Sequence, residues 1–146
     1  IESNLVFVSN TANLLTFPAK SVRPQGLAAA GMAGINLGSS RAIYFGAAEG
    51  ERLVLTAAND SQALGATDSG SYKLTPLKEF PTRGRGSMGV RCHKFLKAED
   101  QLYFASLVSD PPTAFDASGQ ELKLGDQISK RDSTGAASPG YFHGAL

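Results

Sequence analysis

The sequence predicts an all-β protein made of about three repeated units, each holding short antiparallel strands. Apolar, β-branched and aromatic residues fall in runs of about four to six between turn residues, and no stretch sustains the period of an amphipathic helix. An internal repeat with a period of roughly fifty residues fits one four-stranded unit per copy. Repeated units of this size normally stack on their neighbours, and such folds more often bind partners than catalyse reactions.

The repeat is clearest around a basic, glycine-rich stretch, Phe80–Val90, which reads FPTRGRGSMGV. An earlier segment, Val22–Gly26, partly echoes it and continues four residues on as Gly31–Ile35. A third and fainter copy places Lys130–Gly135 where Thr82–Gly86 would fall. The expected units are therefore roughly residues 1–47, 48–100 and 101–146 of one domain.

Each unit contains runs with strand character that end at turn residues such as Asp, Ser, Gly and Pro. The one stretch that leans toward a helix, Leu27–Ala30, is flanked by Gly26 and Gly31, so we expect a loop there. The tail from Ser129 to Gly140 is polar and glycine-rich and is expected to be loosely held. In chain order the strand candidates are Leu5–Val8, Leu14–Phe17, Ala42–Phe45, Leu53–Thr56, Ala63–Thr67, Tyr72–Thr75, Val90–Phe95, Leu102–Ala105, Thr113–Phe115 and Glu121–Leu124.

The bulk properties exclude several classes of protein. With 146 residues the chain is long enough for one domain with a buried core. No apolar run approaches the roughly eighteen residues of a membrane span, and nothing at the start resembles a signal peptide, so we expect no membrane partner. The single cysteine, Cys92, excludes an internal disulfide framework and fits a reducing, cytoplasmic compartment. Without an initiator methionine, and with a repeat already under way, the chain is expected to be a piece of a longer protein.

The charge is strongly segregated along the chain although the net charge is only +1. Between Lys73 and Lys97 there are seven basic residues and one acidic residue, whereas the rest of the chain holds seven basic and twelve acidic residues. Such segregation predicts that the middle unit contacts a polyanion.

The order of these features resembles a known family. A strand ending Leu53-Val54-Leu55-Thr56, a glycine turn, a Leu-Thr-Pro strand and the Phe80–Val90 stretch are similar to the repeat of the C-terminal domain of bacterial type IIA topoisomerase A subunits, that is, gyrase A and its topoisomerase IV counterpart. Residues 53–90 carry the best match, residues 5–47 a good one and residues 102–135 a weak one. The resemblance implies a β-pinwheel, a propeller-like disc of four-stranded antiparallel blades whose basic rim binds and bends duplex DNA without sequence preference.

The resemblance also implies which proteins the chain would act with and which functions it would not carry itself. The B subunit would be a partner, together with the rest of the A subunit. The location would be the cytoplasmic nucleoid, and the catalytic tyrosine and the ATPase of the parent topoisomerase would lie elsewhere. Gyrases that wrap DNA carry a box of the form Gln-Arg-Arg-Gly-Gly-Lys/Arg-Gly, and this chain has no intact copy. The nearest are Thr82–Gly89 and Gln25–Gly31, so strong chiral wrapping is not expected unless a box lies elsewhere in the protein. The degenerate repeats are more similar to the topoisomerase IV side of the family.

Arg83 and Arg85 form the leading candidate site, because glycines let a backbone approach phosphate closely and arginine offers a bidentate fork to phosphate oxygens. The alternative is a tight connector whose arginines only face solvent. On a regular strand Arg91 and Lys94 would point to opposite faces, although both could reach outward from a twisted one. The remaining candidates in the middle unit are Lys73, Lys78 and Lys97, and possible extensions of the basic rim in the first unit are Lys20, Arg23 and Arg41.

Other chemistry has little support in the sequence. Cys92 and His93 are adjacent and have no second Cys or His pair, so neither a zinc site nor a Cys–His nucleophile is expected, and no cofactor is expected. The main alternative function is a propeller-like protein-interaction scaffold without a nucleic-acid role. Strand edges left open at the ends of the repeat would favour self-association.

Overall fold

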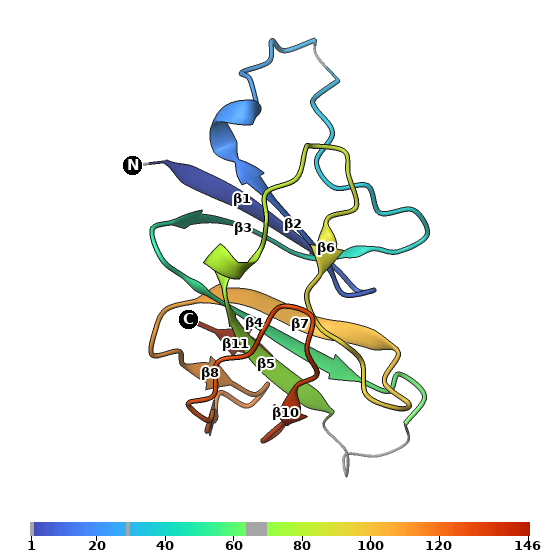
Figure 1. Cartoon of the computed structure of the whole chain (residues 1–146), viewed down its shortest axis with the longest axis vertical. Helices are drawn as coiled ribbons and strands as arrows, with labels where there is room; N and C mark the ends of the chain where they lie inside the picture. The colour runs from blue at the N-terminus through green and yellow to red at the C-terminus, as the bar shows by residue number, and fades with distance from the viewer. Residues whose placement is uncertain (1, 29, 64–69) are drawn as a thin grey trace.

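The computed structural model describes residues 2–28, 30–63 and 70–146 and contains three antiparallel sheets, of which A and B lie one above the other along the long axis of the molecule and C lies beside the strands of sheet B (Figure 1). Sheet A has the order β3-β1-β2-β6, sheet B the order β10-β5-β4-β7 and sheet C the order β11-β8-β9. The strands are β1 (Ser3–Ser9), β2 (Asn13–Pro18), β3 (Ala42–Glu49), β4 (Leu53–Asn59), β5 (Ser71–Pro76), β6 (Val90–Arg91), β7 (Gln101–Val108), β8 (Ala114–Phe115), β9 (Glu121–Leu122), β10 (Ala136–Ala137) and β11 (Gly144–Ala145).

The prediction of an all-β fold with repeated antiparallel units is confirmed. The helical residues in the described part of the chain are confined to two short 3₁₀ turns, η1 (Ala19–Ser21) and η2 (Leu77–Glu79). Each turn follows a proline that ends a strand, Pro18 after β2 and Pro76 after β5, because proline cannot donate the next ladder hydrogen bond.

β4 explains why one run of the sequence lacks the usual alternation of apolar and polar residues. Val54 and Ala58 pack into the core between sheets A and B, whereas Leu53, Leu55 and Ala57 pack into the core between sheets B and C. Successive side chains of a strand point to opposite faces, so a strand in the middle layer is buried at nearly every position, the polar Thr56 included.

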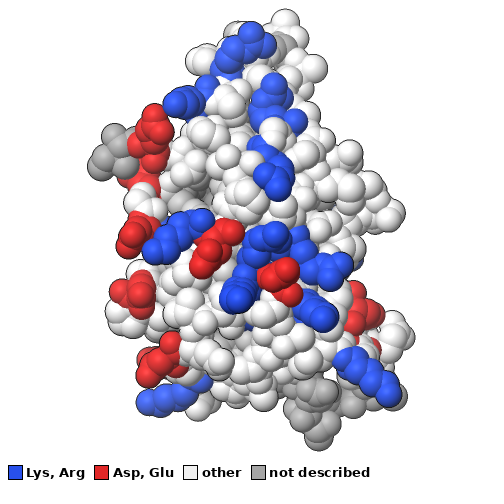
Figure 2. Space-filling view, in the orientation of Figure 1, with Lys and Arg blue, Asp and Glu red and all other residues white. Residues whose placement is uncertain are grey.

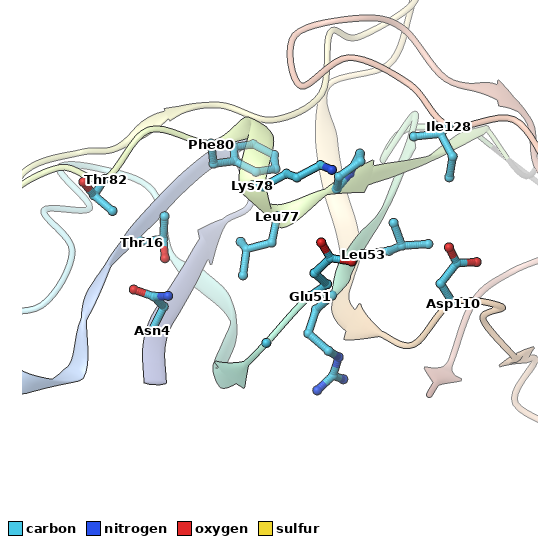
Figure 3. A pocket seen from close by; sticks show the side chains of 13 residues that line it. Asn4, Thr16, Glu51, Leu53, Leu77, Lys78, Phe80, Thr82, Asp110 and Ile128 are labelled. Atoms are coloured by element: carbon cyan, nitrogen blue, oxygen red, sulfur yellow. The ribbon is translucent and has the colours of Figure 1, made fainter. Parts of the chain in front are cut away.

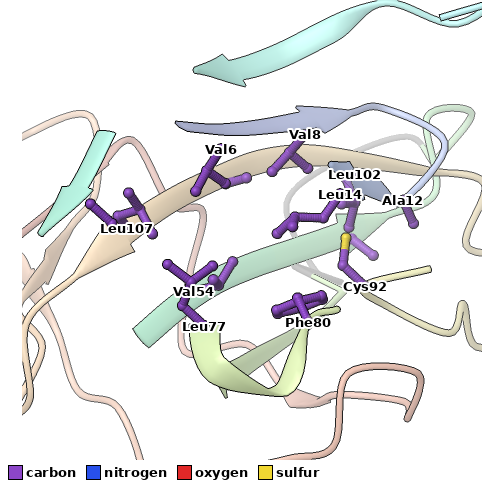
Figure 4. Close-up of a cluster of buried hydrophobic side chains, with 13 residues drawn as sticks. Val6, Val8, Ala12, Leu14, Val54, Leu77, Phe80, Cys92, Leu102 and Leu107 are labelled. Atoms are coloured by element: carbon purple, nitrogen blue, oxygen red, sulfur yellow. The ribbon is translucent and has the colours of Figure 1, made fainter. Parts of the chain in front are cut away.

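The core between sheets A and B is the larger of the two and is shown in Figure 4. Val6, Val8 and Leu14 of sheet A face Leu102 and Leu107 of β7 across it. Phe80, 5% exposed, closes one side directly after η2 and therefore anchors the loop that follows.

Neighbouring sheets are interlocked by their fourth strands. β6 lies in the chain between β5 and β7 of sheet B, yet it pairs with β2 of sheet A. β10 lies between β9 and β11 of sheet C, yet it pairs with β5 of sheet B. Leu14 pairs with Val90 in the first exchange and Tyr72 pairs with Ala136 in the second, so these positions correspond in the repeat.

Several expectations about the elements are corrected. The strand expected over Val90–Phe95 is only the two residues of β6. The boundary expected at residue 100 would separate β7 from β4, and the pairing in sheet B extends the second unit through Val108. The tail after Ser129 is not loose, because it supplies β10. The candidate Ala63–Thr67 falls mostly outside the described residues.

Sheet C is shorter than the other two. The hairpins of sheets A and B hold five and six residue pairs, whereas the β8–β9 hairpin holds two. An Asp116 turn closes it at once, with Asp116 Oδ1 accepting hydrogen bonds from the amides of Ser118 and Gln120. β6 and β10 pair with the first two residues of β2 and of β5, where each strand leaves the hairpin turn. The two-pair β8–β9 hairpin is too short to offer an equivalent pairing site.

Candidate nucleic-acid interface

The basic turn that carries Arg83 and Arg85 is fixed at both ends against sheet A. The Arg83 amide donates a hydrogen bond to Thr16 O at 3.1 Å. Gly89 has φ of +82°, and a Cβ there would collide with the carbonyl group of Leu14. Only glycine fits both demands, so the chain loops outward between these two points and exposes its arginines.

Both arginines are exposed and each has most of its donors unused by the hydrogen bonds of the described residues. Arg85 Nη1 donates to Ala33 O at 3.2 Å, and Arg83 Nη1 donates to Thr82 O at 3.3 Å. A guanidinium has five N–H donors, so both side chains keep the fork that binds phosphate oxygens. The structure therefore places these two residues as the sequence predicted.

Arg91 and Lys94 are both exposed, so the structure has, of the two arrangements left open by the sequence, the one in which both side chains reach outward. The reason is that β6 ends at Arg91 and strand alternation ends with it, which also leaves the adjacent Cys92 and His93 both buried. The Lys94 amide donates to Ser133 O at 2.9 Å and ties this segment to the turn that precedes β10.

That turn contains basic residues absent from the sequence-based candidate site, Lys130 and Arg131. Arg131 Nη1 donates to Arg91 O at 3.3 Å, just as Arg85 Nη1 donates to Ala33 O. Arg131 lies five residues before Ala136 of β10, as Arg85 lies five residues before Val90 of β6. It is therefore the counterpart of Arg85 in the third unit, and the signal that could have found it was the faint echo at Lys130–Gly135.

Basic side chains gather over the upper and middle part of one face of the molecule, and acidic side chains lie along one margin and, in the middle, also between the basic ones (Figure 2). In the same orientation, loops that connect the sheets run across this face (Figure 1). We call the solvent-accessible basic residues of the two repeated turns and of the segment between them the basic cluster. Arg131 is half-buried and the others are exposed; the members are Arg83, Arg85, Arg91, Lys94, Lys130 and Arg131.

Lys78 and Lys97 are exposed but lie apart from these contacts. Lys78 sits on η2 and lines a pocket of about 420 Å³ between sheets A and B (Figure 3). The carboxylates of Glu51 and Asp110 line the same pocket and balance the charges of Lys78 and Arg52, so the pocket has no excess positive charge to attract an anion. Lys97 lies in the turn closed by the Leu96 amide, which donates to Glu99 Oε1.

The prediction that Lys73 contacts DNA is wrong, because its side chain is 1% exposed. Its Nζ donates to Cys92 O at 3.0 Å and to Arg131 O at 2.7 Å. Burial lowers the pKa of this ammonium to about 8.

In the first unit, Arg23 and Arg41 are exposed. Lys20 is exposed as well and forms an ion pair with Glu2 at 3.2 Å. A phosphate that contacted Lys20 would compete with that carboxylate.

A buried hydrogen-bond network lies beneath the basic cluster. Ser71 Oγ donates to Glu99 Oε2 at 2.8 Å, so it can accept from His93 Nε2 at 3.1 Å. His93 Nδ1 then accepts from the Thr56 hydroxyl at 3.0 Å. Burial, with a smaller effect of the Lys73 charge, lowers the pKa of His93 to about 3, so the ring is neutral at physiological pH.

The adjacent Cys92 is fully buried, and this burial raises the pKa of its thiol to about 12. It therefore packs as a small apolar side chain and is not a nucleophile at neutral pH. Within residues 2–28, 30–63 and 70–146, no three His, Cys, Asp or Glu side chains are grouped as metal ligands. The same residues form no helix that could span a membrane.

Comparison with known sequences gives a family match and two informative relatives. A family model described as the DNA gyrase C-terminal domain, beta-propeller, matches residues 3–39 and 63–95. Topoisomerase subunit TopoM of Mycolicibacterium smegmatis is 33% identical over 108 residues, which cover 71% of this chain and 14% of that protein. The A subunit of DNA gyrase from Aeromonas salmonicida is 38% identical over 76 residues, which cover 51% of this chain and 7% of that protein. The chain thus spans a small part of the curated relatives that it matches.

Two solved structures share the fold. The crystal structure of the C-terminal domain of DNA topoisomerase IV aligns with a TM-score of 0.73 at 23% identity and covers 92% of this chain and 42% of its own. The structure of the DNA gyrase A C-terminal domain aligns with a TM-score of 0.66 at 15% identity and covers 99% of this chain and 48% of its own.

Proposed function

The chain belongs to the family of the DNA gyrase C-terminal domain, and from this premise we propose that it binds and bends duplex DNA as part of the A protein of a bacterial type IIA topoisomerase. The domain would hold the DNA segment that the catalytic core passes through a double-strand break. It would act in the cytoplasm on the nucleoid, next to the B subunit, with the rest of its own polypeptide beside it. The chemistry of strand passage would take place outside this chain.

The observation that carries the proposal is the basic cluster. Its side chains come from two equivalent turns and from the segment Arg91–Lys94, and the neighbouring sheets hold the two turns in fixed relation through β6 and β10. Guanidinium and ammonium groups repeated at the spacing of the units suit a phosphate backbone, which repeats its charge along the duplex. Such contacts position DNA and read no sequence.

The proposal is tested by binding and by bending. Fluorescence anisotropy with two duplexes of unrelated sequence should give dissociation constants that agree within about twofold at one salt concentration, because the contacts are to phosphates. Donor and acceptor dyes on the two ends of a duplex should move closer when the chain binds. Equal affinity without a change in end-to-end distance would retain binding and remove bending from the proposal.

The alternative, a protein-interaction scaffold, makes a different prediction. It predicts no competition between duplex DNA and heparin resin for the chain, because neither polyanion would occupy its binding surface. Elution of the chain from heparin by duplex DNA would exclude that alternative.

A further inference from the structure

The two junctions between neighbouring sheets are built alike. We call the contact of the Arg83 turn with sheet A the A–B junction, and that of the Arg131 turn with sheet B the B–C junction. Arg83 N donates to Thr16 O at the first, and Ser129 N donates to Leu74 O at the equivalent place in the second. Two further hydrogen bonds repeat in the same way. Asn36 N donates to Ser87 O at the A–B junction, and Lys94 N donates to Ser133 O at the B–C junction. Arg85 Nη1 donates to Ala33 O at the first, and Arg131 Nη1 donates to Arg91 O at the second.

One contact differs between the junctions. At the A–B junction Gly34 O accepts a hydrogen bond from the Gly86 amide. The residue that corresponds to Gly34 at the B–C junction is Cys92, and its carbonyl oxygen accepts from Lys73 Nζ at 3.0 Å. The same ammonium donates to Arg131 O at 2.7 Å, so a side chain joins the two segments where a backbone amide joins them in the other junction.

The residue that corresponds to Lys73 in sheet A is Leu15, which is 0% exposed. Leu15 shows that an apolar side chain can fill this position in the core. Burying an ammonium group there costs free energy unless its N–H donors are hydrogen-bonded. Lys73 meets that condition through two carbonyl oxygens, those of Cys92 and Arg131. Both carbonyls belong to the segments that carry the accessible basic side chains of this junction.

We propose that Lys73 is a positioning residue that holds the backbones of Arg91–Cys92 and Arg131 together, so that Arg91, Lys94 and Arg131 form one contact point for DNA phosphates. This rests on the proposed function. Lys73 itself does not touch the DNA. Its ammonium acts through the placement of Arg131, whose guanidinium donates to the Arg91 carbonyl.

The first test is a set of binding measurements on the 146-residue chain. Lys73→Leu should weaken binding of duplex DNA about eightfold at ~0.1 M salt, the effect of losing one phosphate contact. The log–log slope of affinity against salt should become shallower by about 1. Lys123→Leu, which removes the same charge from an exposed position next to β9, is the matched control and should change affinity less than about twofold.

A double-mutant cycle separates positioning from a general charge effect. Lys73→Leu should add no further loss in an Arg131→Ala background, and it should add its full loss in an Arg83→Ala background. Full additivity with Arg131→Ala would overturn the inference, as would a Lys73→Leu chain that binds DNA like Lys123→Leu.

Hydrogen exchange gives a readout that does not depend on DNA. The Lys94 and Ser129 amides of the B–C junction should exchange faster in Lys73→Leu, whereas the Asn36 and Arg83 amides of the A–B junction should not change. Unchanged exchange at Lys94 and Ser129 would contradict the inference. If the parent chain shows no salt-dependent binding, the proposed function fails, and exchange still decides whether Lys73 holds the junction.

The unmodified protein offers a test that requires no folded variant of Lys73. Raising the pH from about 7 to about 9 neutralises Lys73 in its buried site and should weaken DNA binding. The groups that face it are Cys92, whose thiol stays protonated in this range, the neutral His93, and the side chains of Asp132 and Arg131. Arg131→Ala is the control and should have a flatter pH profile, and equal profiles would count against the inference.

Discussion

His93 is the residue whose burial has the clearest consequence for stability. Its pKa is about 3 in the folded chain against 6.5 for an exposed histidine, so the unfolded chain binds more protons between these values. The free energy of unfolding should therefore be unaffected above pH 6.5 and should fall as the pH drops below it, by about 2–3 kcal/mol between pH ~7.5 and ~4.5. Urea unfolding at these two pH values measures the difference.

Two substitutions make this prediction specific to His93. His93→Gln should be less stable than the parent at the higher pH but should lose less stability on acidification. His143→Gln, at an exposed position, should behave like the parent at both pH values. A parent chain whose stability is equal at the two pH values would show that His93 is solvated in the folded state.

At the scale of single residues, the exposure of Arg83 and Arg85 could be predicted from the sequence because arginines in a glycine-rich turn are exposed for purely local reasons. Lys73 could not be placed in the same way. Charge alone suggested a surface position, and its burial depends on the distant carbonyl of Arg131, which no local pattern reveals. The internal repeat held a hint, since the corresponding residue in the first unit is the apolar Leu15.

At the scale of elements, Gly89 and Gly31 provide a matched test of the exchanged strand. Both have positive φ, +82° and +89°, but a Cβ on Gly89 would collide with the Leu14 carbonyl, whereas a Cβ on Gly31 would meet open space. Gly31→Ala should cost about 1 kcal/mol of stability from backbone strain alone. Gly89→Ala should cost about 3 kcal/mol or more, because β6 must also move away from β2.

Urea unfolding of the two variants side by side tests the exchange of β6. Equal losses of stability in Gly31→Ala and Gly89→Ala would mean that β6 does not approach β2 as closely as the structure has it.

The long strands were predictable, and two of the short ones, β10 and β11, were not. β1, β2, β4 and β5 are rich in β-branched, aromatic and other apolar residues with turn residues on both sides, and their positions were predicted within a few residues. β10 and β11 consist of alanine and glycine, which have low strand propensity, so only the tertiary pairing makes them strands.

The residue-by-residue alignment of the repeated units also could not be predicted from the sequence. The runs Ala42–Phe45 and Gln101–Phe104 both contain Tyr-Phe, and matching them by sequence aligns Tyr44 with Tyr103. In the sheets, however, Tyr44 pairs with Val8 and Phe104 pairs with Ala57, and each pair directly precedes the same irregularity in the ladder. The true correspondence is shifted by one residue, because loop lengths differ between the copies and apolar residues alone cannot fix a register.

At the scale of the whole molecule, β3 is the strand edge through which we expect the chain to associate with itself. It is eight residues long, forms one edge of sheet A and carries Phe45, which is 60% exposed. An apolar open edge favours pairing with another chain, and a lysine on such an edge opposes it. The apparent mass from sedimentation should therefore rise with protein concentration, and Phe45→Lys should reduce the rise. A constant mass over a wide concentration range would contradict this expectation.

The central claim, also at this scale, is that the basic cluster binds DNA through phosphates. About four to six contacts with one duplex predict a log–log slope of affinity against salt of about −4 to −5. The most direct measurement is this slope for the parent chain, for Arg83→Ala/Arg85→Ala and for the charge-conserving control Arg83→Lys/Arg85→Lys. The alanine variant should have a slope shallower by about 2 and weaker binding to every sequence, while the lysine variant keeps the parent slope. A salt-independent signal, or an alanine variant with the same slope as the parent, would contradict the account.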